Sequence, residues 1–304
     1  MIYPKPLLPG SRVRMIGISG CLHVEDIPAE VENCRQRLER LGFHVEIDPT
    51  CMQQVGYLSG EDRTRAEAIN RAFQDDAVDG VWCMKGGWGV NRMLPYVDFE
   101  SIRMHPKAFI GYSDITSMHL ALHRYADFVT FHGPMGTSAS WSEDVCSSLL
   151  HALAGKPDEV FQHEKLQCIR KGKAEGEIIG GNLSLLVSSL GTEYAPETEG
   201  KILFIEEVGE KVYRIDEFLC HLYLAGKLRN LAGLVFGGFT RCENEYPGKG
   251  FELPEILQFW ADKAGCPCAG GLQCGHIPEN YTLPLGVHYR LDADLGELRL
   301  TERN

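Results

Sequence analysis

Apolar residues in the first half of the chain fall into two alternating patterns, short continuous runs and longer segments with helical spacing. Residues 13–19 form a short apolar run that ends in small residues, which is typical of a buried strand. Residues 28–41 carry apolar side chains at helical spacing, and Gly42 follows where a helix would end. Strands that alternate with helices favour a parallel sheet with helices on both faces. The same patterns predict further strands over 43–47, 78–84, 108–111 and 128–131, and further helices over 61–73 and 116–125.

The pattern loosens after residue 155, and the stretch 165–176 is mostly polar, with three lysines and two glycines, as a linker would be. We therefore predict an N-terminal domain over 1–160, a linker over 161–175 and a C-terminal domain over 176–304. Residues 287–300 alternate around Asp294-Leu295-Gly296, which predicts a hairpin. The other elements predicted in the second half are strands over 176–179, 201–205 and 231–236, and helices that begin at Asn182 and cover 213–225 and 253–264.

Length, charge and cysteine content narrow the class of protein. At roughly 150 residues per domain, 304 residues predict two domains. A formal net charge of −12 argues against nucleic acid as a partner, because phosphate binding needs a basic face. Eleven cysteines is an odd number, and residues 1–14 do not resemble a signal peptide, so we expect free thiols in a reducing cytoplasm. No run approaches the roughly 18 apolar residues of a membrane span, so no membrane association is predicted.

Ser113 is the first candidate for chemistry, because it stands between the predicted strand 108–111 and the predicted helix 116–125. In an open α/β sheet, ligands bind beyond the carboxyl ends of the strands. A serine on a tight strand-to-helix turn is exposed, with the next amide directed toward its hydroxyl. The match to a G-x-S-x-G elbow is imperfect, because Ile115 replaces the second glycine. The alternative is that Ser113 only caps the helix.

The glycine-rich turn 85–89 (KGGWG) is the second candidate. Glycines after a strand let backbone N–H groups approach a ligand closely, so this turn could hold a phosphate or supply half of an oxyanion hole. No G-K-[ST] follows, which excludes a P-loop. The alternative is a turn without a ligand.

Two acidic residues and a histidine complete the candidates. Glu206 and Glu207 end an apolar strand, and their side chains point to opposite faces, so only one is expected to enter a site. Ile205 and Glu206 continue the buried run, which favours Glu206 over a solvated strand end. His276 lies in a loop between glycine and proline, where histidines are more often functional than in helices.

Two further groups resemble metal sites without matching them. His119 and His123 are four residues apart on a predicted helix, but no glutamate stands between them, so H-E-x-x-H is absent. Cys266, Cys268 and Cys274 with His276 lack the C-x-x-C spacing of structural zinc.

Several segments together resemble the serine LD-carboxypeptidases, a family that includes murein tetrapeptide carboxypeptidase and the microcin C immunity peptidases. The resemblance covers nearly the whole chain in the right order, and it departs from the family at Trp88, where tyrosine is common. The matching segments are 85–89 (KGGWG), 111–114 (GYSD), 131–135 (FHGPM), 180–183 (GGNL), 203–210 (LFIEEVGE), 275–276 (GH) and 283–286 (LPLG).

The resemblance implies a role for each candidate. Ser113 would be the nucleophile, Glu206 the acid and His276 the base, with the backbone amides of Gly87 and Asp114 as the oxyanion hole. It implies a flavodoxin-like N-terminal domain with a parallel sheet and a smaller C-terminal α/β domain that carries the acid and the base. It also implies a cytoplasmic homodimer that needs neither metal nor cofactor.

The expected function is a serine carboxypeptidase that cleaves the L,D-amide bond and releases terminal D-alanine from the murein tetrapeptide in peptidoglycan recycling. One alternative is an immunity peptidase that hydrolyses a toxic aminoacyl nucleotide of the microcin C type; the compact stretch from Gly191 to Gly200 favours the cell-wall role. Another alternative is a two-lobed ligand-binding protein without catalysis, since a fold alone does not decide function.

Overall fold

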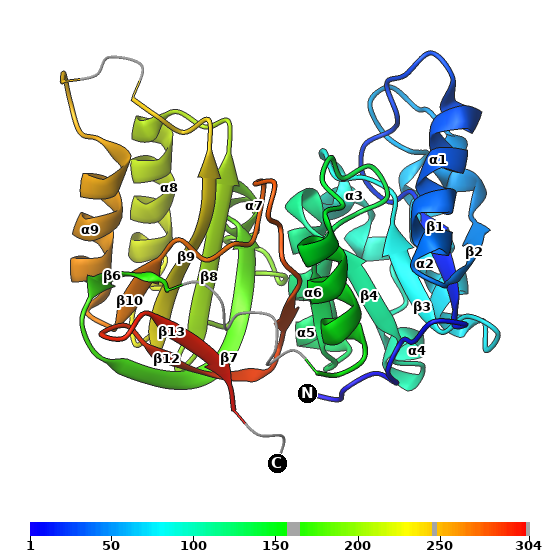
Figure 1. The fold of residues 1–304 in the computed structure, drawn as a ribbon. Coiled ribbons are helices and arrows are strands. Elements are labelled where there is room, and N and C mark those ends of the chain that lie inside the picture. Colours follow the sequence, from blue (N-terminus) through cyan, green and yellow to red (C-terminus); the bar gives the residue numbers. More distant parts are fainter. Residues whose placement is uncertain (157–164, 245–247, 302–304) are drawn as a thin grey trace.

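The computed structural model describes residues 1–156, 165–244 and 248–301. They form two lobes that lie side by side, each built around one sheet (Figure 1). One buried apolar cluster contains residues of both lobes, among them Phe131 and Leu283 near the first sheet and Phe204 in the second. The two lobes are therefore packed against each other through a shared core.

The first sheet has the strand order β11-β5-β4-β3-β1-β2, and all five strands from the first half of the chain are parallel. The order 2-1-3-4-5 is that of the flavodoxin-like fold, which confirms the predicted fold class. The sixth strand, β11, comes from the second half and pairs antiparallel with β5. The strands are β1 (Arg12–Ile16), β2 (His44–Ile47), β3 (Gly80–Cys83), β4 (Ala108–Gly111), β5 (Thr130–His132) and β11 (Leu283–Leu285).

Helices cover both faces of the first sheet. Successive strand residues point to opposite faces, and each set packs against a different group of helices. Met15 and Trp82 pack in the cluster that contains residues of α1 and α6, whereas Ile16 and Cys83 pack in the cluster that contains residues of α2, α4 and α5. The helical segments of this lobe are α1 (Ile27–Arg40), η1 (Pro49–Met52), α2 (Asp62–Gln74), α3 (Val90–Met93), η2 (Leu94–Tyr96), α4 (Phe99–Met104), η3 (Ser113–Ile115), α5 (Thr116–Tyr125) and α6 (Glu143–Leu153).

The second sheet has the order β13-β12-β7-β8-β9-β10-β6, with β7 to β10 parallel and the outer strands antiparallel. Its strands are β6 (Gln167–Arg170), β7 (Lys173–Asn182), β8 (Ile202–Val208), β9 (Gly233–Thr240), β10 (Cys268–Gly270), β12 (His288–Asp292) and β13 (Glu297–Leu300). The helices α7 (Leu183–Ser188), α8 (Val212–Leu224) and α9 (Leu253–Ala264) pack against one face. None of the helices in the described ranges has the length and apolar content that crossing a bilayer requires.

The predicted linker differs from the structure where it can be compared. Residues 161–164 lie outside the described residues, but β6 and the start of β7 occupy most of 165–175. The strand β6 lies at the edge of the sheet, and both β6 and the start of β7 carry exposed polar side chains, so this stretch lacks the apolar run of a buried strand. The division into domains at 1–160 and 176–304 stays a prediction.

Candidate active site

Ser113 lies directly beyond the carboxyl end of β4, in the turn that leads into α5. Its backbone is left-handed, with φ +66°, a conformation that non-glycine residues adopt at an energetic cost. The N-cap positions of η3 and α5 are held by Tyr112 and Ile115, so Ser113 caps neither segment. The structure therefore does not support the alternative that Ser113 is a simple helix cap, and the strained turn is what a nucleophile elbow requires.

The turn 85–89 follows β3 and lies against Ser113. A methyl group on Gly86 would come within 2.8 Å of Ser113 Cβ and 3.0 Å of its Oγ, so only glycine allows this approach. Gly87 has φ +126°, and its amide, like that of Asp114, donates no hydrogen bond within the described part of the chain. Two amide donors thus stand without protein partners, one beside Ser113 in sequence and one in the adjoining turn.

Glu206 is fully buried in β8, opposite an irregularity of the neighbouring strand. Ile205 pairs with Phe236 and Glu207 with Phe239, so Gly237 and Gly238 together oppose the single residue Glu206. A β-bulge of this kind bends a strand and redirects side chains. Because Gly237 has no side chain, the loop that carries His276 can pack directly against it. A methyl group on Gly237 would lie 2.5 Å from the carbonyl oxygen of Cys274.

The loop between β10 and β11 brings His276 to Glu206. The Nδ1 atom of His276 lies 2.7 Å from Glu206 Oε2, and the His276 amide donates to the same oxygen at 3.2 Å. Gly275 has φ +118°, and a methyl group there would come within 2.7 Å of Oε2, so glycine is required. The Thr240 hydroxyl donates to the His276 carbonyl at 2.6 Å. A neutral imidazole held through Nδ1–H presents Nε2 as a proton acceptor.

Glu207 has a different environment, although it is also buried. Its carboxylate accepts hydrogen bonds from Asn182 Nδ2 and from the amides of Ser184 and Val208, at 2.8 to 2.9 Å. Burial raises its pKa, and these donors act in the opposite direction. The two carboxylates are therefore divided as the alternation predicts: Glu206 faces His276 and Glu207 holds the start of α7.

Ser113 and His276 come from different lobes and approach the same place. The ring centroid of Tyr112, which precedes Ser113, lies 4.9 Å from that of His276, with the two ring planes tilted by 59°. Ser113 Oγ makes no hydrogen bond to His276 among the residues described, so the structure joins the histidine to Glu206 but does not close the contact to the serine. Catalytic hydrogen bonds are often long without substrate and tighten when it binds.

The two groups that resemble metal sites have other roles. The His119 and His123 rings both contact the Thr130 hydroxyl, at 2.8 and 2.9 Å, inside the first lobe. Cys274 Sγ lies 3.2 Å from Nδ1 of His132. Within the described ranges no cluster of three or more metal-ligating side chains was found. Cys266 and Cys268 pack in a buried apolar cluster of the second lobe.

Acidification is expected to lower stability through the buried histidines. Burial lowers the pKa of His119 from 6.5 to about 4, so between these values the unfolded chain binds a proton that the folded chain excludes. The free energy of unfolding should fall by up to about 1.4 kcal/mol per pH unit in this window for that histidine. Urea unfolding of His119→Gln should show a shallower fall below pH 6.5 than wild type. Equal slopes would contradict this.

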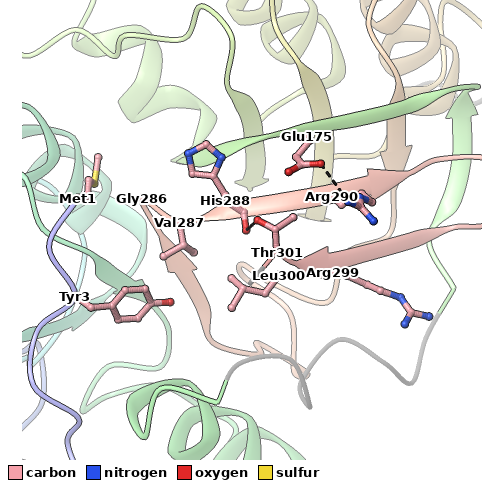
Figure 2. Close-up of a pocket in the computed structure, with 10 residues that line it drawn as sticks. All are labelled: Met1, Tyr3, Glu175, Gly286, Val287, His288, Arg290, Arg299, Leu300 and Thr301. Carbon is pink, nitrogen blue, oxygen red and sulfur yellow. Dashed lines mark hydrogen bonds and ion pairs between the residues drawn. The ribbon is translucent and has the colours of Figure 1, made fainter. Parts of the chain in front are cut away.

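A separate cavity of about 860 Å³ lies away from these residues, between the start of the chain and the hairpin β12–β13 (Figure 2). Met1 and Tyr3 line one side, and His288 and Arg290 line the other. Arg290 pairs with Glu175 at 3.4 Å, as the dashed line in Figure 2 shows. None of the proposed catalytic residues lines this cavity.

Sequence reasoning missed several residues around the candidate site. Gly275 was noted only as a neighbour of His276, Tyr112 was not singled out, and the side chains of Asp114 and Arg65 were not considered. Arg65 stands in an amphipathic, charged helix three residues after Asp62, where the sequence suggests an exposed ion pair. Only the tertiary structure shows that its guanidinium is buried.

Comparisons with known proteins show the family of this chain. Residues 13–133 match the family model of the LD-carboxypeptidase N-terminal domain, and residues 175–291 match that of the C-terminal domain. A protein of Bacillus subtilis named probable murein peptide carboxypeptidase is 37% identical over 93% of this chain and 89% of its own length. The murein tetrapeptide carboxypeptidase of Pseudomonas aeruginosa is 32% identical over 81% of each chain.

Solved structures show the same fold. The microcin C7 self-immunity protein MccF, in complex with aspartyl sulfamoyl adenosine, superposes with a TM-score of 0.88 and covers 100% of this chain and 99% of that one. The sequences are 24% identical, so this likeness supports the fold alone.

Proposed function

Because this chain belongs to the LD-carboxypeptidase family of serine-type hydrolases, we propose that Ser113, His276 and Glu206 hydrolyse an L,D-amide bond in a peptidoglycan-derived peptide. The observation that carries the assignment of residues is the 2.7 Å contact between His276 Nδ1 and the buried Glu206 carboxylate. In this proposal the contact holds the imidazole near the turn of Ser113, which is supported by the 4.9 Å between the ring centroids of Tyr112 and His276.

Each group has a defined part in the proposed reaction. His276 Nε2 takes the hydroxyl proton while Ser113 Oγ bonds to the substrate carbonyl carbon, and Glu206 stabilises the imidazolium that forms. The amides of Gly87 and Asp114 donate to the oxyanion. The C–N bond then breaks, the leaving amine of D-alanine takes the proton from His276, and an acyl-enzyme remains. Water, deprotonated by His276, hydrolyses that ester and restores the serine.

The substrate that we propose is a murein tetrapeptide that ends in D-alanine. The support is the names of the two relatives that are 37% and 32% identical to this chain. The experiment is to compare kcat/KM of the purified protein on a murein tetrapeptide and on an aminoacyl sulfamoyl adenosine. A preference for the tetrapeptide is expected. Hydrolysis of the nucleotide conjugate alone would instead favour the immunity reaction.

The second candidate function, cleavage of a microcin-type conjugate, has the fold similarity to MccF in its favour. Against it stands the short segment between α7 and β8. This segment is tied to α5 through Tyr125, whose hydroxyl donates to the Glu193 carbonyl at 3.2 Å, and through Arg124, which pairs with Glu197 at 2.8 Å. A segment held down in this way offers little free chain for a large nucleotide.

The setting that we propose for the enzyme is the cytoplasm, where it would work as a homodimer on recycled cell-wall peptides. All eleven cysteines are free, which suits a reducing compartment. Light scattering on the purified protein tests the dimer, with a mass of twice 33.9 kDa expected.

A further inference from the structure

Arg65 of α2 holds its guanidinium completely out of solvent, beside the turn that carries Gly87. Nη1 donates to the carbonyl oxygens of Ile18 at 2.6 Å and Gly89 at 2.9 Å, and Nε donates to that of Gly60 at 3.1 Å. Nη2 pairs with Asp62 at 2.6 Å. One side chain thereby connects the loop after β1, the start of α2 and the end of the 85–89 turn.

The Asp114 carboxylate binds the same two segments from the other side. It is 1% exposed, and its Oδ2 accepts from the Ser19 hydroxyl at 2.6 Å and from the Val90 amide at 3.0 Å. Ser19 directly follows Ile18, and Val90 directly follows Gly89. Arg65 therefore donates to a backbone carbonyl in each of the two segments, at Ile18 and Gly89. Asp114 accepts from the residue that follows each of these, at Ser19 and Val90.

Between these contacts lies Gly87. The Gly20 amide donates to the Gly86 carbonyl at 3.2 Å, so the turn is held before Gly87 as well as after it. A methyl group on Gly87 would come within 3.2 Å of Gly20 Cα, which shows how closely the two segments pack. The direction of the Gly87 amide is thus set by how these two segments lie against each other.

A buried cation and a buried carboxylate are costly unless they are paired and fully hydrogen-bonded. Arg65 forms an ion pair with Asp62, which also pairs with Arg92, and its remaining hydrogen bonds go to backbone carbonyls. The charge of Asp114 attracts Arg65 without a direct contact between the two side chains. Asp114 Oδ1 is buried with no hydrogen bond from the described residues. Apolar side chains at positions 65 and 114 would avoid the free energy of burying these charges. We therefore attribute the two charged side chains to a role in shaping the 85–89 turn.

We propose that Arg65 and the Asp114 side chain are positioning residues that hold the Gly87 amide in register with the Asp114 amide, so that both donate to one oxyanion. The inference rests on the proposed function, because it concerns the oxyanion hole of that reaction. It assigns Asp114 two separable parts: its backbone amide contacts the reacting oxygen, and its carboxylate fixes the second donor.

Asp114→Ala separates these two parts, because alanine keeps the backbone amide and removes only the carboxylate. We expect kcat to fall about 100-fold, the typical effect of losing one oxyanion donor, with KM changed less than about threefold. Asp114→Asn keeps an acceptor for Val90 and Ser19 and should restore most of the activity. Ser19→Ala removes one of the two contacts and should cost about 10-fold in kcat; it serves as the second variant if Asp114→Ala does not fold.

Asp292→Ala is the matched control, because Asp292 is also a nearly buried carboxylate with a cationic partner, Lys173, and a backbone amide, that of Leu295. It lies in β12 of the second sheet, so its loss should lower stability and leave kcat near wild type. If folded Asp114→Ala and Ser19→Ala both keep kcat within about threefold of wild type, the positioning role is wrong. An equal fall of kcat in Asp292→Ala would also overturn it, since the effect would then be general destabilisation.

A second readout separates this inference from the proposed function. A fluorophosphonate forms a tetrahedral adduct on an activated serine and uses the oxyanion hole without any peptide substrate. If wild type is labelled on Ser113 and Asp114→Ala is labelled about 100-fold more slowly, the inference holds even where the substrate is misassigned. Equal labelling rates would refute the inference alone, whereas wild type that is neither labelled nor active would refute the proposed function.

Discussion

Replacing Ser113 by alanine is expected to lower kcat for release of D-alanine from a murein tetrapeptide by at least about several hundred-fold. The reason is that this change removes the proposed nucleophile from the left-handed turn beyond β4, beside the two amides that we propose as the oxyanion hole. The protein should remain folded, because the Ser113 side chain caps neither η3 nor α5. The measurement is turnover by amino-acid release, together with the thermal midpoint of unfolding.

The control for this prediction is Ser189→Ala. Ser189 is also buried, and its hydroxyl donates to the Leu186 carbonyl at 2.7 Å at the end of α7, so it is held by the helix backbone. This variant should keep wild-type turnover. Near-wild-type turnover in Ser113→Ala would show that the nucleophile is misassigned.

Replacing Glu206 by glutamine is expected to lower kcat about 10,000-fold, as the equivalent change does in other serine triads. Glutamine has nearly the same shape but no charge, so it cannot stabilise the imidazolium that forms when His276 takes the serine proton. Its amide nitrogen also competes with the Nδ1–H donor, which favours the wrong tautomer. Stability should change little, and KM should stay near that of wild type.

Glu207→Gln provides the internal comparison, because Glu207 is the adjacent carboxyl in the same strand. Its oxygens accept from Asn182, Ser184 and Val208, and a glutamine amide group would face one of these donors. This variant should lose about 1–3 kcal/mol of stability and keep kcat within a few-fold of wild type. If Glu207→Gln abolished turnover and Glu206→Gln did not, the assignment of the two carboxylates would be reversed.

The regular part of the fold was accessible from the sequence because its signals are local. The strand β4 and the helices α5 and α9 have the predicted bounds, since the apolar spacing and, for α9, the flanking Pro254 and Gly265 are local signals. The strand β11 was missed. It has three residues with a central proline, and it forms only because an edge of the first sheet is open beside β5. Its pairing depends on a strand more than 140 residues earlier, which no local pattern reports.

The candidate site also combines features that local sequence shows with contacts that only the fold creates. A serine after a strand and a histidine between glycine and proline are visible in the sequence. The contact from His276 to Glu206 spans 70 residues and depends on the bulge at Gly237 and Gly238. The burial of Arg65 could not be predicted from the sequence. Its place in the helix predicts an ion pair with Asp62 but not the contacts with backbone carbonyls of two distant loops.

We propose that Ser113, His276 and Glu206 act together as one relay across the two lobes. The most direct test is a crystal structure of the protein after reaction with a fluorophosphonate. We expect phosphorus bonded to Ser113 Oγ, one of its oxygens about 2.7–3.1 Å from the amides of Gly87 and Asp114, and His276 Nε2 within hydrogen-bonding reach of the serine oxygen. An unmodified Ser113, or a His276 imidazole beyond hydrogen-bonding distance of the serine oxygen in the adduct, would show that these residues do not form a relay.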